Sequence, residues 1–177
     1  MNTPSAFVPS QCMGLVGLGL VGTALAKRLR TAGYQCIGWD VRQEAMLAFE
    51  TAGFEVCASV DFLLKQTNTL VLSVFDTSGV HAVVEQIQQL RIIQNQSSLS
   101  VITLIDCSTG DPVKLAELAP ALAADNIQFI EAPLSGSSVQ IENGQATLLL
   151  GGDVLHIQNA APVLNALATF QQHVGGA

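Results

Sequence analysis

Short apolar runs alternate along the chain with longer segments in which apolar residues recur every three or four positions. The runs have the length of buried strands, and the longer segments have the period of helices that bury one face. The predicted strands cover residues 12–16, 35–39, 54–57, 69–75, 101–106, 127–131, 147–150 and 169–174. The predicted helices cover residues 20–31, 43–51, 61–66, 80–92 and 154–167, and one more begins at Pro112.

Residues between these segments carry helix-start and loop signals. Ser59 precedes the third predicted helix as its N-cap, and Asp111 precedes Pro112 in the same role. The polar stretch 94–100 is predicted to be a loop. Regular alternation of strands and helices predicts the α/β class, with a doubly wound, mostly parallel sheet and helices on both faces.

A G-x-G-x-x-G motif lies between the first predicted strand and the first predicted helix. In this context Gly17 permits a tight turn, Gly19 lets the backbone approach a pyrophosphate, and Gly22 lets the helix pack near the strand. The amides at the helix start then face the phosphates. The predicted cofactor-binding run is Gly17, Leu18, Gly19, Leu20, Val21 and Gly22. The motif predicts a Rossmann-type dinucleotide-binding domain.

Asp40 ends the second predicted strand, eighteen positions after Gly22. A carboxylate at this place accepts hydrogen bonds from the ribose hydroxyls and repels a 2′-phosphate, so NAD is favoured over NADP. Arg42 leaves two interpretations open. Its guanidinium could hold the 2′-phosphate of NADP, or it could be a solvated residue in the first turn of the next helix.

The ligand of a doubly wound sheet lies outside the carboxyl ends of its strands, so residues that follow strands are candidate site residues. Val74 and Phe75 could pack against adenine or ribose, or could simply end an ordinary strand. Ser108 and Thr109 place two hydroxyls where the nicotinamide should lie. These four residues complete the predicted cofactor site.

Length and composition predict one soluble domain. The chain has 177 residues, of which 49% are hydrophobic, and we expect residues 1–11 to be a disordered tail before the domain. Residues 13–26 mimic the apolar core of a signal peptide, but no Lys or Arg precedes them and their glycines have phosphate-loop spacing. No segment approaches the roughly 20 apolar residues of a membrane span. A cytoplasmic location is therefore expected.

Charge and cysteine usage exclude several functions. The formal net charge is -7 and only 12% of residues are charged, with no basic patch, so neither nucleic acid nor an anionic membrane is an expected partner. The four cysteines, at positions 12, 36, 57 and 107, lie in or beside apolar runs without C-x-x-C spacing. They are expected to be buried, reduced thiols, and no metal site is predicted.

Three motifs in order resemble those of the 3-hydroxyacid dehydrogenases, the family of 3-hydroxyisobutyrate dehydrogenase and, more distantly, 6-phosphogluconate dehydrogenase. The family's G-L-G-x-M-G matches residues 17–22, its D-x-S-T-x-x-P matches residues 106–112, and its D-A-P-V-S-G-G-x-x-G-A-x-x-G-T-L resembles the segment 131–148. The resemblance covers nearly the whole chain. It implies hydride transfer between NAD and a small 3-hydroxy or 2-hydroxy acid.

The resemblance also implies a substrate loop in which Ser135, Gly136 and Ser137 hold the substrate carboxylate. Ser137 replaces the second glycine of the family's S-G-G, Gln140 replaces a later motif glycine, and Glu131 replaces the usual aspartate. These differences place the substrate, more than the fold, in question.

The family's general acid or base is a lysine in an all-helical second domain that also forms the dimer. That domain would follow Ala177 and is expected to be absent here. None of Lys27, Lys65 and Lys114 matches the lysine motif, so no catalytic base is assigned. The chain alone is then expected to bind cofactor without turnover, to carry no catalytic residue, and to expose an apolar patch on 154–168 that favours association. Two alternatives stay open, namely a nucleotide-binding module without catalysis and an imine reductase domain.

Overall fold

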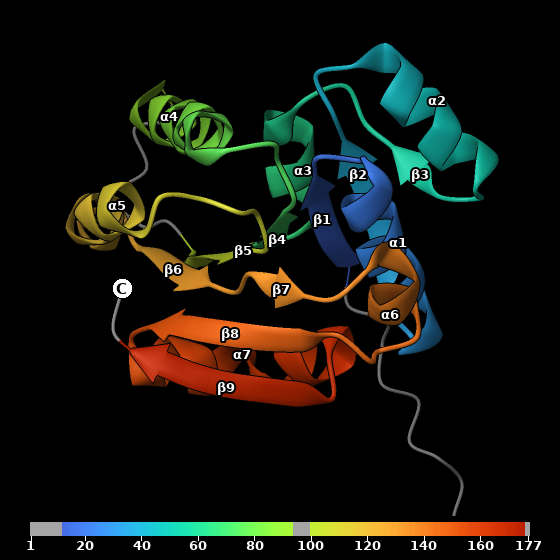
Figure 1. Ribbon diagram of the computed structural model, residues 1–177. Helices are drawn as coiled ribbons and strands as arrows, with labels where there is room; N and C mark the ends of the chain where they lie inside the picture. Colours follow the sequence, from blue (N-terminus) through green and yellow to red (C-terminus); the bar gives the residue numbers. More distant parts are fainter. Residues whose placement is uncertain (1–11, 94–99, 176–177) are drawn as a thin grey trace, which may run out of the picture.

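The structure is a computed structural model, and it describes residues 12–93 and 100–175. Its strands form a single sheet in the order β3-β2-β1-β4-β5-β6-β8-β7, and β9 pairs with the other side of β8 (Figure 1). The strands are β1 (Cys12–Val16), β2 (Gln35–Trp39), β3 (Glu55–Val56), β4 (Thr69–Leu72), β5 (Ile102–Asp106), β6 (Ile127–Glu131), β7 (Leu134–Ser135), β8 (Thr147–Gly152) and β9 (Phe170–Gly175). The six strands from β3 to β6 are parallel, so the predicted doubly wound sheet is confirmed.

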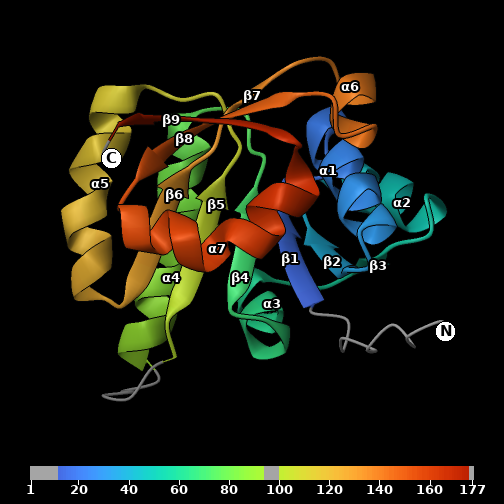
Figure 2. The ribbon, with the colours of Figure 1, turned by 90° about the horizontal axis from the view of Figure 1, so that it is seen from below.

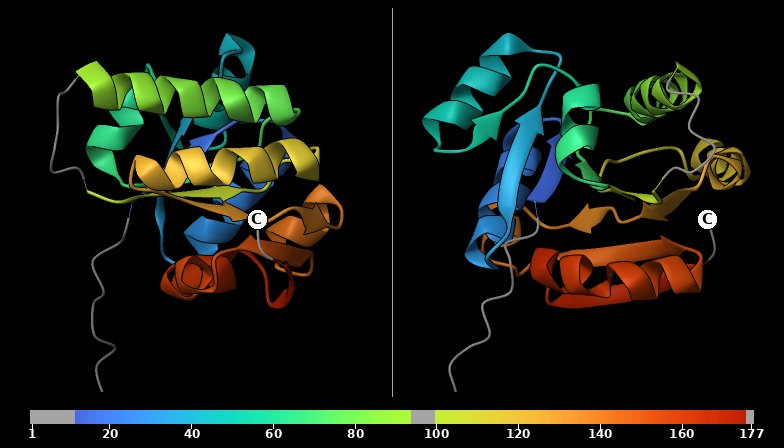
Figure 3. Two further views of the ribbon diagram at one scale, coloured as in Figure 1. Left: turned by 90° about the vertical axis from the view of Figure 1, so that its left-hand side faces the viewer. Right: turned by 180° about the vertical axis from the view of Figure 1, so that it is seen from behind.

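Helices cover both faces of this sheet (Figures 2 and 3). They are α1 (Leu20–Thr31), α2 (Gln43–Thr51), α3 (Val60–Gln66), α4 (Thr77–Ile93), α5 (Pro112–Ala124), α6 (Ser138–Glu142) and α7 (Val154–Leu167). Apolar residues of α1, α2 and α7 form one core cluster with alternate strand residues, whereas those of α3, α4 and α5 form the other. Burial on both faces explains why the strands are almost continuously apolar.

The last third of the chain departs from the parallel pattern. β8 runs antiparallel to both β6 and β7, while β9 returns through α7 and lies parallel to β8. β7 and α6 are not predicted by the sequence, because two and five residues are too few to show a period.

Most other predicted elements are confirmed within two residues, and the main differences lie around β4. β4 ends at Leu72 and not at Phe75, because the amide of Val74 leaves the ladder and donates to Ser108 Oγ at 3.0 Å. α4 begins at Thr77, three residues earlier than predicted. The carboxylate of Asp76 explains this start, since it accepts a hydrogen bond from the amide of Gly79 at 3.0 Å.

Three basic residues of α1 connect this helix to other elements. Lys27 pairs with Glu142 of α6 at 3.1 Å, and Arg28 Nε donates to the carbonyl oxygen of Ala166 at 2.8 Å. The Arg28 guanidinium also lies over Gly144, where a Cβ would come within 2.6 Å of Cζ. Arg30 lies over the ring of Phe54, 4.1 Å from its centroid. Side chains of α1 therefore contact α6, α7 and the residue before β3, which lie in both halves of the chain.

Some expectations concern surfaces and termini. The expected tail, residues 1–11, lies outside the described residues, and so does the expected loop 94–100 apart from Ser100. Within residues 12–93 and 100–175, no helix is long and apolar enough to cross a membrane.

Burial raises the pKa of the Cys36 thiol to about 12, but Cys12 is only half-buried, contrary to expectation. The expected patch on α7 is narrower than predicted, because the second half of the helix packs on the sheet and only its start exposes Val154 and Leu155.

Candidate functional site

The turn after β1 requires glycine at two positions. Gly17 has φ +90°, and a Cβ there would overlap the carbonyl oxygen of Ser73. Gly22, in the first turn of α1, lies so close to the turn that a Cβ would overlap the carbonyl oxygen of Gly17. The amide of Gly17 donates to the carbonyl oxygen of Trp39 at 3.0 Å, which joins the turn to β2. Two glycines therefore fix the backbone of this loop for steric reasons.

Gly19 has space for a side chain, whereas Gly17 and Gly22 have none. A Cβ at this position would find only Arg42 Nη2, 3.8 Å away. Gly19 is the N-cap of α1, and no side chain caps this helix, whereas α3, α5, α6 and α7 are capped by Ser59, Asp111, Ser137 and Asp153. The amides at the start of α1 are thus left for an anionic ligand, which the positive end of the helix dipole attracts.

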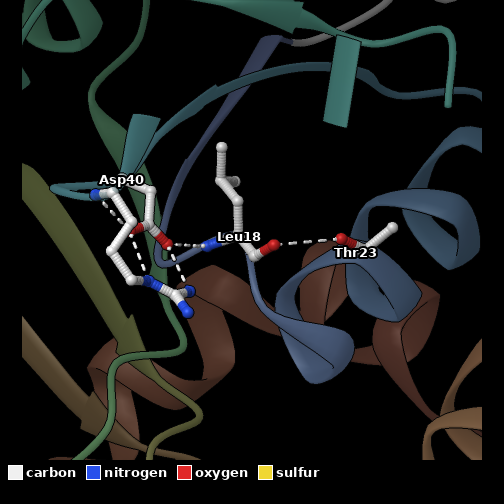
Figure 4. Close-up of polar contacts among 4 residues, drawn as sticks. Leu18, Thr23 and Asp40 are labelled. Carbon is white, nitrogen blue, oxygen red and sulfur yellow. Dashed lines mark hydrogen bonds and ion pairs between the residues drawn. The ribbon is translucent and has the colours of Figure 1, made fainter. Parts of the chain in front are cut away.

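Asp40 holds the glycine loop by a hydrogen bond to the backbone of Leu18 (Figure 4). Its Oδ2 accepts a hydrogen bond from the amide of Leu18 at 2.8 Å, and the Thr23 hydroxyl donates to the carbonyl oxygen of Leu18 at 3.3 Å. Burial alone would raise the pKa of Asp40, but its hydrogen bonds from Arg42 and Leu18 outweigh burial and lower it. Asp40 is therefore a carboxylate with a structural role in the loop.

Arg42 precedes the first turn of α2, contrary to one interpretation, although its side chain is largely exposed, as that interpretation expected. It is the N-cap of α2 and folds back on Asp40, with Nε 3.1 Å from Oδ1 and Nη2 3.1 Å from Oδ2. Its own amide also donates to Oδ1 at 2.8 Å. The Asp40 side chain is 5% exposed and that of Arg42 is 55% exposed, so the guanidinium covers the carboxylate. A ligand reaches Asp40 only if Arg42 moves or shares it.

These residues lie in one cleft of about 660 Å³ at the carboxyl ends of the central strands. The cleft is lined by most of the predicted cofactor residues, namely Gly17, Gly19, Leu20, Val21, Asp40, Val74, Phe75, Ser108 and Thr109. Two others lie beneath it, since Leu18 is buried and Gly22 packs on the turn. Ser135, Gly136 and Ser137 do not line the cleft.

Sequence reasoning missed several lining residues. They are Val16, Trp39, Val41, Gly79, Ala82, Val83 and Gln86, whereas Ser73 and Cys107, which also line the cleft, belong to the strand-end segments that the sequence had indicated. Val16 and Trp39 directly precede the loops already chosen, so the strand-end rule could have found them. The four residues from α4 share one helical face through their spacing of three and four, which was a detectable signal.

The second wall of the cleft depends on Ser108 and Asp106. The amide of Val74 donates to Ser108 Oγ at 3.0 Å, and the amide of Ser108 donates to Asp106 Oδ1 at 2.9 Å. Asp106 is 1% exposed, and its buried Oδ2 has no hydrogen-bond partner among the described residues. Burial raises the pKa of Asp106, although hydrogen bonds from Ser108 oppose this, and Asp106 in turn helps burial to raise the pKa of Glu131.

We expect Asp106→Asn to stabilise the fold by about 1 kcal/mol at pH 8, because it removes a buried, unpartnered charge and keeps an acceptor for the Ser108 amide. The raised pKa means that the folded state holds a proton that the unfolded state has lost once the pH exceeds the ordinary carboxyl value of 3.8. Stability of the unmodified protein should therefore fall as the pH rises through the folded-state pKa of Asp106. Urea unfolding between pH 4 and 8 measures both effects, and a variant that is less stable than the parent at pH 8 would contradict them.

The expected substrate loop contains a capping box. Ser137 Oγ accepts a hydrogen bond from the amide of Gln140 at 3.3 Å, and Gln140 Oε1 accepts one from the amide of Ser137 at 2.8 Å. The two residues that differ from the family motif thus bond to each other. Gly136 has φ +151°, and a Cβ there would lie 3.0 Å from that of Ala146. A carboxylate bound at this loop would have to compete with Gln140 for the Ser137 amide.

The sequence model of the NAD binding domain of 6-phosphogluconate dehydrogenase matches residues 12–175. The chain belongs to this family. The match runs from the first residue of β1 to the last residue of β9, so the NAD-binding domain family accounts for every described element.

Relatives of this NAD-binding domain are dehydrogenases and other oxidoreductases. Human mitochondrial 3-hydroxyisobutyrate dehydrogenase is 30% identical over 147 residues, which are 79% of this chain and 40% of that protein. The structure of Mycobacterium tuberculosis 3-hydroxyisobutyrate dehydrogenase with L-serine superposes with a TM-score of 0.84 at 20% identity, over 95% of this chain and 55% of that one. An imine reductase variant from Myxococcus stipitatus in complex with NAD+ gives 0.81 at 20% identity, over 94% and 55%. These two likenesses show the fold, and the chain spans about half the length of the relatives it matches.

Proposed function

We propose that residues 12–175 bind NAD as the cofactor domain of an oxidoreductase that acts on a small hydroxy acid. The observation that carries this proposal is the uncapped start of α1, where Gly19 leaves room for a ligand beside free helix amides. Family membership supports the same ligand. Bound NAD would supply the hydride acceptor and donor, which no amino acid side chain can replace.

We assign a set of cleft residues to each part of the dinucleotide. The amides of Gly19, Leu20 and Val21 would bind the pyrophosphate, and Asp40 would accept from the adenosine ribose after Arg42 shifts. Arg42 makes two hydrogen bonds to a buried carboxylate, so the ribose hydroxyls would have to replace those bonds when the guanidinium moves. Ser108 and Thr109 would border the nicotinamide. NADP is the less favoured ligand, because its 2′-phosphate would lie near the Asp40 carboxylate.

The proton of the reaction needs a group that we propose lies outside the described residues. Lys27 and Lys65 are paired with Glu142 and Asp61, and Lys114 is on α5, away from the cleft lining. The relatives are about twice as long as this chain, so the lysine implied by the resemblance belongs to their additional length. The substrate carboxylate would bind at Ser135 and Gly136, with Ser137 released from Gln140.

Calorimetric titration with NAD and NADP tests the cofactor proposal. We expect NAD to bind more tightly than NADP, and Asp40→Asn to weaken NAD binding by about tenfold, because one acceptor for the ribose is lost while the other still holds Leu18. Arg42→Ala should leave NAD affinity within about twofold and weaken NADP binding by about tenfold, since a 2′-phosphate would lose its cationic partner.

Asp61→Asn is the matched control, because Asp61 also forms an ion pair with a basic neighbour but lies outside the cleft. It should bind both nucleotides as the parent does. Preferential binding of NADP, abolished by Arg42→Ala, would reverse the proposed preference, and a folded sample that binds neither nucleotide would contradict the cofactor role altogether.

Imine reduction is the second candidate reaction, because an imine reductase has this fold. Both reactions would use the same cofactor cleft and differ in the group that handles the proton. Activity of a longer form of this protein toward a 3-hydroxy acid and toward a cyclic imine separates them. Turnover of the imine alone would favour the second candidate.

A further inference from the structure

The α4 wall of the cleft carries one polar side chain, Gln86. Gly79, Ala82, Val83 and Gln86 lie on the same face of α4 and line the cleft opposite the loop that contains Asp40 and Arg42. In Figure 1 and in the right view of Figure 3, α4 and α2 stand apart at the upper edge of the molecule with α3 between them. Gln86 is half-buried, and its carboxamide makes no hydrogen bond to a residue in the described ranges. It is therefore available to a ligand in the cleft.

The position of Gln86 along α4 indicates which end of the ligand it meets. The first turn of α4 adjoins the loop after β5, since the amide of Asp111 donates to Thr77 Oγ1 at 2.8 Å. Ser108 and Thr109 belong to that loop and mark the nicotinamide end. Gln86 lies nine residues beyond Thr77, about 13 Å along the helix axis. It is thus remote from the nicotinamide end, and the rest of the cleft lining, which includes Asp40 and Val41, belongs to the adenosine side of the proposed pose.

The surroundings of the adenosine side suit a planar base. Val41 and Phe75 line the cleft and are 80% and 96% exposed, so both present apolar surface that an aromatic base could cover. Ala82 and Gly79 leave the α4 wall free of bulk. Apolar walls bind any purine alike, so they do not distinguish one base from another. A carboxamide at the edge of this space can do so, because it offers one acceptor and one donor.

We propose that Gln86 recognises the adenine base, with Oε1 accepting from the 6-amino group and Nε2 donating to N7. This inference rests on the proposed cofactor function and adds a specificity-determining residue to it. Gln pairs with adenine in this bidentate manner in other recognition sites. Hypoxanthine has acceptors at both positions, so the same carboxamide satisfies only one of them. A site that bonds a polar group rejects the analogue that lacks it.

Calorimetry with NAD and with nicotinamide hypoxanthine dinucleotide tests the assignment. The unmodified protein should bind NAD about tenfold more tightly than the hypoxanthine analogue. Gln86→Leu should weaken NAD binding by about tenfold and bring the ratio of the two affinities close to one, because leucine keeps the size of the side chain without its hydrogen bonds. The change in ratio reports the base contact even if the substitution alters affinity in general.

Gln89→Leu is the control, since Gln89 lies on the same helix, is exposed and does not line the cleft. It should keep the full preference for NAD. Equal affinities for both dinucleotides in the unmodified protein, or an unchanged ratio in Gln86→Leu, would overturn the role of Gln86 and leave the NAD proposal standing. Binding of neither dinucleotide would overturn both.

Discussion

Replacement of Gly17 by alanine is expected to lower the free energy of unfolding by about 4 kcal/mol. Two costs add at this position. Gly17 has φ +90°, which costs an L side chain about 1–2 kcal/mol, and the new Cβ would overlap the backbone carbonyl of Ser73. The amide of Ser73 donates to the carbonyl oxygen of Val16 at 2.8 Å, so this backbone cannot move aside as a flexible side chain can, and the overlap is relieved only by displacing the start of the β4–α4 loop. Urea unfolding followed by circular dichroism measures the loss.

Gly33→Ala is the matched control for this substitution. Gly33 has nearly the same conformation, φ +94°, but a Cβ there meets no atom within 4 Å. It should lose only the conformational part, about 1 kcal/mol. Equal losses in the two variants would show that the close approach between the glycine turn and Ser73 is not rigid, and the steric account of the loop would be wrong.

Gly19→Ala should have the opposite profile, with a nearly unchanged free energy of unfolding and an NAD affinity about 100-fold lower. The conformation at Gly19 is an extended one with φ −71°, and its Cβ would have space in the free protein. In the complex, the same methyl group would stand between the pyrophosphate and the amides of α1. Loss of one or two charge-assisted hydrogen bonds accounts for a reduction of this size.

Calorimetric titration and thermal unfolding of the same samples separate the two properties. Gly33→Ala again serves as the control, because Gly33 is outside the cleft lining, and it should bind NAD as the parent does. NAD affinity of Gly19→Ala within about threefold of the parent would place the pyrophosphate away from the start of α1.

The cofactor loop could be predicted from sequence because its determinants are local. Gly22 is needed for its contact with Gly17 five residues earlier, Gly17 is needed locally for its positive φ, and the strand and helix on either side have clear periods. The N-caps Ser59 and Asp111 were predicted for the same reason, since each bonds an amide two or three residues ahead. Local chemistry of this kind is visible in a single sequence.

Other features depend on side-chain directions that a sequence does not specify. Arg42 could point to solvent or to the cleft, and only the fold shows that it covers Asp40. Ser137 and Gln140 each looked like an isolated departure from a motif, whereas the structure shows one reciprocal pair. The proposed role of Gln86 on the cleft wall depends on α4 lining the same cleft as the β2–α2 loop, which is a tertiary relation.

The contacts of α1 with distant segments affect how a nascent chain acquires its nucleotide site. Lys27 and Arg28 bond to residues 115 and 138 positions later. While the protein is being synthesised, β1 and the glycine loop emerge early, but the carbonyl of Ala166 that holds Arg28 emerges only after β1 to β8 have been made. Contacts of such long range form late and slow the folding of a domain. The helix that carries the glycine loop therefore reaches its final position only after the ribosome has made nearly all of the sheet.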